Sequence, residues 1–226
     1  MKSKLTLISA AAAVVQLASC NGNPLEDIDY NDPVFHALTE TESGTKTMLG
    51  KEDNAGNVPI MWSSGDEIIV TGDSREKACS YYKTADKNTS AAEFRYDRSK
   101  NGNRRTLKKD KWYAFYPSSS YSFSGEEHIM ELPQKQTYSP DNIGEGAMPM
   151  YAVSDDDNLS FRNLCGILRI RLNSLKNRLS ISRIKIASDK NLSGKIIRYS
   201  AQDGIGYLTS EGSSKASAWL DRKSVG

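Results

Sequence analysis

The sequence predicts an all-β protein built of sandwich domains. Short runs rich in Val, Ile, Tyr, Phe and Trp recur along the chain, and clusters of Gly, Asn, Asp, Ser and Pro separate them. Residues 165–172, "CGILRIRL", show the clearest period of two. Leu168, Ile170 and Leu172 are expected to face a core, and the two arginines between them water. No window of about 11 residues carries an amphipathic helical stripe.

The first residues have the layout of a secretory signal peptide. Lys2 and Lys4 precede a nearly uncharged apolar run that ends at Leu17, and the small residues Ala18 and Ser19 follow. This run is shorter than the roughly 18 residues that a membrane-spanning helix needs. Residues 1–19 are therefore expected to be removed, with cleavage between Ser19 and Cys20.

Leu17-Ala18-Ser19-Cys20 resembles the lipobox of bacterial lipoproteins. The resemblance implies a diacylglycerol thioether on Cys20 and a fatty acyl group, such as palmitate, on its new amine. Three acyl chains exceed the two signals that stable anchoring needs. The mature chain has no second apolar run near 18 residues, so it is expected to be anchored to a membrane without spanning it.

The polar, acidic residues 20–33 predict a flexible tether that holds the folded part away from the membrane. The formal net charge is only +2, but the charges are unevenly spread. Basic residues dominate 95–111 and 162–198, whereas 26–53 are acidic. We interpret the basic stretches as solvated strand faces and loops, and expect no nucleic-acid partner.

The expected strands of the first domain, residues 34–160, follow in order. The turn Ser63–Asp66 separates two β-type runs closely enough to predict a hairpin. Trp62 and Trp112 are expected to be largely buried. The predicted strands are "VFHALTE" (34–40), "VPIMW" (58–62), "EIIVTG" (67–72), "CSYYKT" (79–84), "AEFRY" (92–96), "WYAFYP" (112–117) and "HIMEL" (128–132).

A second β domain is expected over residues 161–226. In "LSISRIKIA", Leu179 and Ile181 lie on one parity and Ile184 and Ile186 on the other, which predicts a bulge near Ser182. The strand "KIIRY" follows a turn. This stretch has room for about four strands, so the second sandwich is expected to be incomplete and the chain truncated.

The sequence offers little support for catalysis. His36 and His128 lie in no nucleophile or zinc pattern and are expected to be ordinary surface or strand-edge residues. "SDDDN" (154–158) is expected to be a hairpin turn because it lacks the calcium-loop spacing. Cys79 and Cys165 are either one disulfide or two buried free thiols. No acid, base and nucleophile set is visible. We therefore expect no enzyme activity, no cofactor and no metal.

Several phrases in a fixed order resemble the fimbrillin-like lipoproteins, the major and minor fimbrial subunits of Gram-negative anaerobes. They cover roughly residues 34–198. The phrases are "FHALTETESGTKTML", "VPIMWSSGDEIIV", "YYKT", "AEF", "WYAFYP", "LPQKQTY", "MPMYAVS" and "LSFRNLCGILRIRL".

This resemblance implies two transthyretin-like β-sandwich domains, with the boundary just before "LSFRNLCGILRIRL". Family members are exported as lipoproteins and assemble into fimbriae, or cap and anchor them. In the polymerising members a trypsin-like protease removes an N-terminal strand, and a strand of the next subunit fills the groove. The resemblance also implies a surface-exposed place at the cell outer membrane. The implied partners are that membrane, other fimbrial subunits and a surface glycan or protein.

The chain departs from the family at its maturation site. No Arg lies between Cys20 and Arg75, so Lys46 and Lys51 are the possible cleavage sites near the expected first strand. The family's donor strands lie near the C-terminus, whereas this chain ends inside the second domain. It is expected not to polymerise alone, and to act as a base or accessory subunit.

An alternative function is a surface glycan-binding lipoprotein that serves a nutrient uptake system. Such a protein would present a flat row of exposed aromatic side chains. Only residues 112–123, "WYAFYPSSSYSF", offer such a row. A fimbrial or adhesive function without enzyme activity remains the first expectation.

Overall fold

The structure is a computed structural model, and all the residues that it describes lie in one unit, residues 32–226. It describes residues 32–39, 48–49, 60–72, 78–106, 108, 110–124, 127–137, 143, 146–168, 170, 181–199, 208–215 and 217–221. Within these ranges, strands dominate, and the helical elements are one short α-helix and one turn of 3₁₀-helix. The all-β prediction is confirmed.

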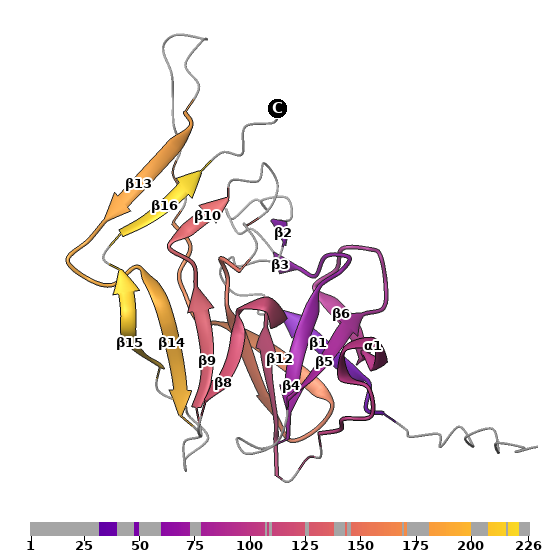
Figure 1. The fold of residues 1–226 in the computed structure, drawn as a ribbon. Helices are drawn as coiled ribbons and strands as arrows, with labels where there is room; N and C mark the ends of the chain where they lie inside the picture. Colours follow the sequence, from indigo (N-terminus) through magenta and orange to yellow (C-terminus); the bar gives the residue numbers. More distant parts are fainter. Residues whose placement is uncertain are drawn as a thin grey trace, which may run out of the picture. The chain divides into compact units, whose positions relative to one another are not determined.

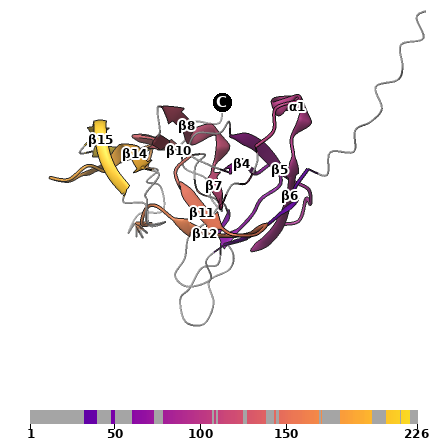
Figure 2. The ribbon, with the colours of Figure 1, turned by 90° about the horizontal axis from the view of Figure 1, so that it is seen from below.

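Seven strands form a closed barrel (Figures 1 and 2). Neighbouring strands pair antiparallel, except β1 and β12, which run parallel. Around the ring the strands are β1 (Phe35–Thr39), β12 (Asn158–Asn163), β11 (Met150–Ser154), β7 (Trp112–Tyr116), β4 (Glu67–Thr71), β5 (Cys79–Lys83) and β6 (Ala91–Tyr96).

The closed ring differs from the two separate sheets of the predicted sandwich. β7 pairs with both β4 and β11, and β1 pairs with both β6 and β12. These two junctions join what would otherwise be the edges of two packed sheets. A closed ring leaves no strand edge within the barrel.

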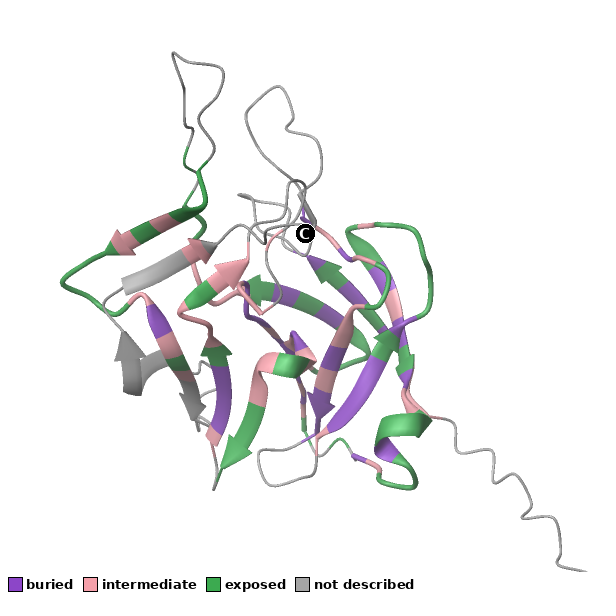
Figure 3. Ribbon diagram, turned by 45° about the horizontal axis from the view of Figure 1, so that its top comes forward, coloured by how far each residue is buried: buried purple, intermediate pink, exposed green. Residues whose placement is uncertain are grey.

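The barrel interior is filled by the inward-facing side chains of all seven strands. Buried residues alternate with exposed ones along several of these strands (Figure 3). The indole of Trp62 is fully buried and meets the rings of Phe94, Phe161 and Tyr116 edge-on, with centroids 5.0, 5.1 and 5.3 Å away. Trp112 is 5% exposed. The predicted burial of both tryptophans is confirmed, and burial of side chains of this size contributes about 2–3 kcal/mol each.

The remaining strands form three further sheets. One contains β15 (Leu208–Lys215), β14 (Ser193–Tyr199), β9 (Glu127–Leu132) and β8 (Tyr121–Ser124), in this order. The second contains β10 (Lys135–Thr137), β16 (Ser217–Asp221) and β13 (Arg183–Ala187), and the third contains β2 (Met48–Leu49) and β3 (Ile60–Met61).

These pairings cross the predicted domain boundary. β9 pairs with β14, and β10 pairs with β16, although the sequence assigns the partners to different domains. The boundary between residues 160 and 161 falls inside β12, which is a single barrel strand.

The hairpin predicted around Ser63–Asp66 is wrong, although the turn itself is present. Gly65 has a φ of 82°, and the Asp66 carboxylate accepts a hydrogen bond of 2.5 Å from the Ser63 amide. The turn connects β3 to β4, but β3 pairs with β2 and β4 pairs with β5 and β7. The chain therefore passes from one sheet to another at this turn.

The strand predicted at residues 165–172 is also wrong over the part that the structure describes. Residues 166–168 and 170 lie outside the strands, and the side chains of Leu168 and Ile170 are 67% and 43% exposed. An alternating pattern buries its apolar side only where other elements cover it. Leu172 lies outside the described residues.

The bulge predicted near Ser182 does not form, because β13 begins after it, at Arg183. Ile181 is exposed, whereas Ile184 and Ile186 are half-buried on one face of β13. Leu179, the other residue of the predicted first parity, lies outside the described residues.

Candidate functional site

The first barrel strand, β1, is the candidate functional element. It lies between β6 and β12 and closes the ring (Figure 1). Phe35, Ala37 and Thr39 point into the barrel and are buried, whereas His36 and Leu38 point outward. This alternation follows from the period of two in "FHALT" and confirms the first strand predicted from the sequence.

Backbone pairing holds both edges of β1. On one side Phe35, His36, Ala37 and Leu38 stand opposite Phe94, Glu93, Ala92 and Ala91 of β6. On the other, His36 to Thr39 stand opposite Asn158 to Phe161 of β12. The amide of His36 donates to the Asp157 carbonyl at 2.9 Å, and that of Thr39 donates to the Ser90 carbonyl at 3.0 Å.

The ring of Phe35 is fully buried beneath β1. Its centroid lies 4.9 Å from the ring of Tyr81 and 5.2 Å from that of Trp112, and both contacts are edge-on. Edge-on aromatic pairs add about 0.5–1.5 kcal/mol to the burial of the ring itself. Phe35 therefore contributes strongly to holding β1 in place.

Ala37 and Thr39 occupy smaller spaces along the strand. The indole nitrogen Nε1 of Trp62 donates to the Ala37 carbonyl at 3.2 Å. The hydroxyl of Thr39 lies 3.2 Å from the Ile60 carbonyl oxygen and 3.4 Å from that of Ser90. The inward side of β1 thus carries a large aromatic, a small and a hydroxyl-bearing side chain at alternate positions.

An ion pair joins the residues before β1 to another part of the barrel. The Nε atom of Arg105 lies 2.7 Å from the Oδ1 atom of Asp32, and their side chains are 22% and 17% exposed. Arg105 follows the helix α1 (Arg98–Asn101), far from Asp32 in the sequence. A half-buried ion pair is screened less than one in open solvent.

The guanidinium of Arg105 is also held by Tyr96 at the end of β6. Its central carbon lies 4.3 Å from the centre of the Tyr96 ring, and a terminal nitrogen donates to the Tyr96 hydroxyl at 2.6 Å. The same nitrogen lies 3.3 Å from the Gly102 carbonyl and 3.0 Å from the Arg104 carbonyl. None of these partners belongs to β1.

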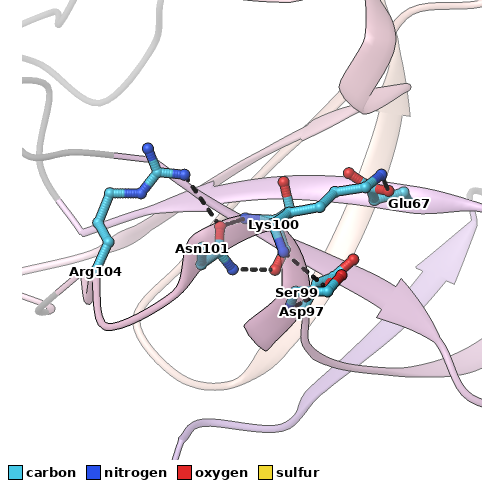
Figure 4. A network of polar contacts seen from close by, with 7 residues as sticks. Glu67, Asp97, Ser99, Lys100, Asn101 and Arg104 are labelled. Atoms are coloured by element: carbon cyan, nitrogen blue, oxygen red, sulfur yellow. Dashed lines mark hydrogen bonds and ion pairs between the residues drawn. The ribbon is translucent and has the colours of Figure 1, made fainter.

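A polar network fixes α1 and the loop that carries Arg105 (Figure 4). The Asp97 carboxylate caps the helix by accepting from the amides of Ser99 and Lys100. The buried side chain of Asn101 exchanges two hydrogen bonds with the backbone of Ser80 in β5, at 2.9 and 2.8 Å. The Arg104 guanidinium donates to Asn101, and Lys100 forms an ion pair with Glu67 of β4.

The groups around Arg105 have shifted pKa values. Burial raises the pKa of Tyr96, and the Arg105 charge opposes that rise. Burial likewise raises the pKa of Cys79, against the charges of Arg104 and Arg105. The hydroxyl and the thiol therefore stay neutral at pH 7, and the ionic contact formed at this place is that between Asp32 and Arg105.

The aromatic stretch of residues 112–123 does not form a flat exposed row. Trp112 and Phe115 are buried, Tyr113, Tyr116 and Tyr121 are half-buried, and Phe123 is 38% exposed. Several of these rings pack around His128 of β9, whose Nδ1 atom lies 2.9 Å from the Tyr121 hydroxyl. Phe115 stacks on the imidazole at 4.7 Å between ring centroids.

The predicted site residues Ser19, Cys20, Lys46 and Lys51 lie outside the described residues. In the described ranges no helix is long and apolar enough to cross a membrane, and no group of His, Cys, Asp or Glu side chains could hold a metal ion.

Further predicted features lie inside the described ranges. Cys79 and Cys165 are not joined in a disulfide, and burial raises the pKa of Cys165 to about 11. Asp156 accepts from the Ser154 hydroxyl and the Asn158 amide in the turn between β11 and β12, which confirms the predicted hairpin turn. His36 is exposed as expected, whereas His128 is buried, contrary to its expected place at the surface or a strand edge.

Sequence reasoning missed the ion pair at the start of β1. It assigned Asp32 to the tether and Arg105 to a basic stretch of the surface. The only signal in the sequence is that Asp32 lies two residues before the first β-type run. A single sequence contains no information that pairs this acid with a distant arginine.

Compared with known proteins, the chain matches no family model, no curated protein sequence and no solved structure.

Proposed function

We propose that this protein is a lipid-anchored, fimbrillin-like surface protein that acts as a structural or accessory subunit in fimbria assembly or adhesion. Cys20 carries the lipid, and the folded part lies outside the outer membrane. In this proposal β1 is a replaceable strand, and the groove between β6 and β12 receives a strand of another subunit.

The observation that carries the proposal is the place of β1. It is the first strand of the described chain, it pairs parallel with β12, and its inward side chains fill separate spaces in the core. Loss of β1 would open one slot with two unpaired edges and an empty aromatic pocket. Main-chain hydrogen bonds and side-chain pockets are the two means by which a sheet recruits an extended segment.

The possible cleavage sites differ in what they would remove. A cut after Lys46 would separate β1 from the rest of the chain and leave β2 (Met48–Leu49) attached, still paired with β3. A cut after Lys51 would separate β2 as well. A cut after Arg75 would also take Trp62 and β4, and so remove part of the core. Cleavage after Lys46 therefore removes the fewest strands together with β1.

The proposed cleavage also couples the anchor to the groove. Cys20 and β1 lie on the same side of either lysine, so after cleavage only the non-covalent contacts of β1 would hold the folded part to the lipid. Replacement of β1 by a strand of another subunit would then release the protein from the membrane. Without cleavage the protein would remain a base or accessory subunit.

The glycan-binding alternative has less support. The one stretch that could form an aromatic platform is largely used inside the protein, because Trp112 and Phe115 are buried and Tyr121 packs against His128. We therefore favour assembly over sugar recognition.

Fatty-acid labelling and mass spectrometry of purified fimbriae test the proposal together. An alkyne fatty acid should label the wild type and not Cys20→Ser, and fimbriae should contain the chain with a new N-terminus at Thr47 or Glu52. The control variant Lys46→Gln/Lys51→Gln should retain the lipid and keep Cys20 as its N-terminus. Equal labelling of the wild type and Cys20→Ser, or absence of the chain from fimbriae, would refute the proposal.

A further inference from the structure

We propose that Arg105 selects the strand that enters the β1 groove, by pairing with a carboxylate three residues before the aromatic side chain that fills the Phe35 pocket. This inference rests on the proposed function, because it assumes that β1 can be replaced. It adds a recognition rule for the partner. The incoming segment carries an acidic residue. Counted from that residue, a large aromatic residue follows three positions later, a small residue five positions later and a hydroxyl-bearing residue seven positions later.

The geometry makes Arg105 a fixed part of the groove. Its guanidinium is held by the ring and hydroxyl of Tyr96 and by the carbonyls of Gly102 and Arg104, all outside β1. The loop that carries it is tied to β5 through Asn101. Departure of β1 would therefore remove the Asp32 carboxylate and leave the guanidinium in place. A preorganised cation loses little freedom when it binds a new carboxylate.

The spacing between the required residues of the incoming segment is taken from β1 and the residues before it. Asp32 pairs with Arg105, Phe35 fills the pocket of Tyr81 and Trp112, and Ala37 and Thr39 fill the next two inward positions. Inward positions alternate along a strand, so residues five and seven positions after the acid have fixed places once the acid and the aromatic ring are seated. The ion pair therefore sets the register as well as the affinity.

Charge complementarity favours an acid over a neutral residue at the first position. The Arg105 side chain is 22% exposed, so a segment that places an apolar or basic residue beside it would leave a partly desolvated cation without its carboxylate. Unpaired or like charges in such a place act against wrong partners more strongly than the pair favours the right one.

Peptide exchange into the full chain tests the inference. A sequence for a site-specific protease is inserted after Thr45, the chain is cut, and a fluorescent peptide with the sequence of residues 31–40, "NDPVFHALTE", is allowed to replace β1. Affinities are measured for this peptide, for its Asp32→Asn and Asp32→Lys forms, and for a Phe35→Ala form that tests the aromatic pocket. The Asp32→Asn peptide should bind roughly tenfold more weakly, and the Asp32→Lys peptide more weakly still.

A charge exchange supplies the decisive comparison. Arg105→Glu should weaken the binding of the parent peptide and restore the binding of the Asp32→Lys peptide. The matched control is Arg98→Glu, which makes the same change of charge on the exposed face of α1 and should leave the preference for Asp32 unchanged. If Arg105→Glu does not fold, Arg105→Gln replaces it. The wild-type protein should then bind the parent peptide more tightly than its Asp32→Asn form, and Arg105→Gln should bind the two equally.

The outcomes separate the inference from the function on which it rests. If the Asp32→Asn peptide binds as tightly as the parent and the Phe35→Ala peptide does not, the groove exchanges strands but Arg105 does not select them, and the inference is overturned. If no peptide enters the groove, not even the parent, then both the replaceable strand and the inference are overturned. If binding is tight only when peptide residue 32 and protein residue 105 carry opposite charges, the inference is supported.

Discussion

At the scale of single residues, side chains on the two faces of β1 have very different energetic roles. Phe35 and Leu38 are both apolar and lie in the same short strand, but the first is fully buried and the second is 47% exposed. Removal of a buried aromatic ring loses its transfer free energy and leaves a cavity in a close-packed core. Removal of an exposed side chain leaves no cavity.

We therefore predict that Phe35→Ala lowers the free energy of unfolding by about 3–5 kcal/mol, and that the matched control Leu38→Ala changes it by less than about 0.5 kcal/mol. Urea denaturation followed by tryptophan fluorescence measures both. Similar losses for the two variants would mean that Phe35 does not occupy the pocket of Tyr81 and Trp112.

The Cys165 thiol gives a pH-dependent prediction at the same scale. Its folded pKa of about 11 lies above its ordinary value of 9.0 because burial disfavours the thiolate. The neutral thiol therefore adds stability that is fully present below about pH 9 and is lost as the pH rises toward 11. In Cys20→Ser/Cys79→Ser, iodoacetamide labelling of Cys165 should still accelerate above pH 10, whereas a free cysteine levels off. A labelling rate that has levelled off by about pH 10 in the folded variant would contradict this.

At the scale of elements, α1 is stabilised chiefly by its connections to neighbouring strands. It has only four residues, too few for a helix to be stable by itself. Asp97 caps its start, and the buried Asn101 satisfies both backbone groups of Ser80. These contacts fix the loop that presents Arg105 to the groove.

We predict that Asn101→Ala costs about 1–3 kcal/mol, because it leaves the buried amide of Ser80 without its partner. The Ser80 carbonyl keeps the hydrogen bond that it accepts from the Asp97 amide at 3.0 Å. The neighbouring variant Lys100→Ala removes an exposed ion pair to Glu67 and should cost less than about 1 kcal/mol. Thermal unfolding of the two variants provides the comparison. A larger effect of Lys100→Ala would show that the ion pair, and not Asn101, attaches α1 to the barrel.

At the scale of the whole molecule, closure of the barrel depends on one strand near the start of the described chain. Local alternation in "FHALT" was enough to predict β1, and β-type runs predicted β4, β5, β6, β7 and β9 close to their observed bounds. The parallel pairing of β1 with β12 is a contact between distant segments, so no local pattern predicts it. The same is true of the Asp32–Arg105 ion pair.

The failures of sequence reasoning have the same cause at this scale. "CGILRIRL" has a better alternation than "FHALT", but its apolar side chains Leu168 and Ile170 are exposed. β3 and β4 are joined by a proper turn and still do not pair with each other. Alternation and turn chemistry determine local conformation, whereas pairing depends on which strands compete for the same edge.

The central claim is that β1 is a separable strand whose departure leaves a defined groove between β6 and β12. Hydrogen–deuterium exchange of the chain cut after Thr45 tests it most directly, before and after β1 is removed in mild urea. The account predicts that the amides of β6 and β12 that face β1 lose protection, that those of β4, β5 and β7 keep it, and that added peptide of residues 31–40 restores it. Loss of protection in all seven barrel strands at once, or full protection of β6 and β12 without β1, would contradict the account.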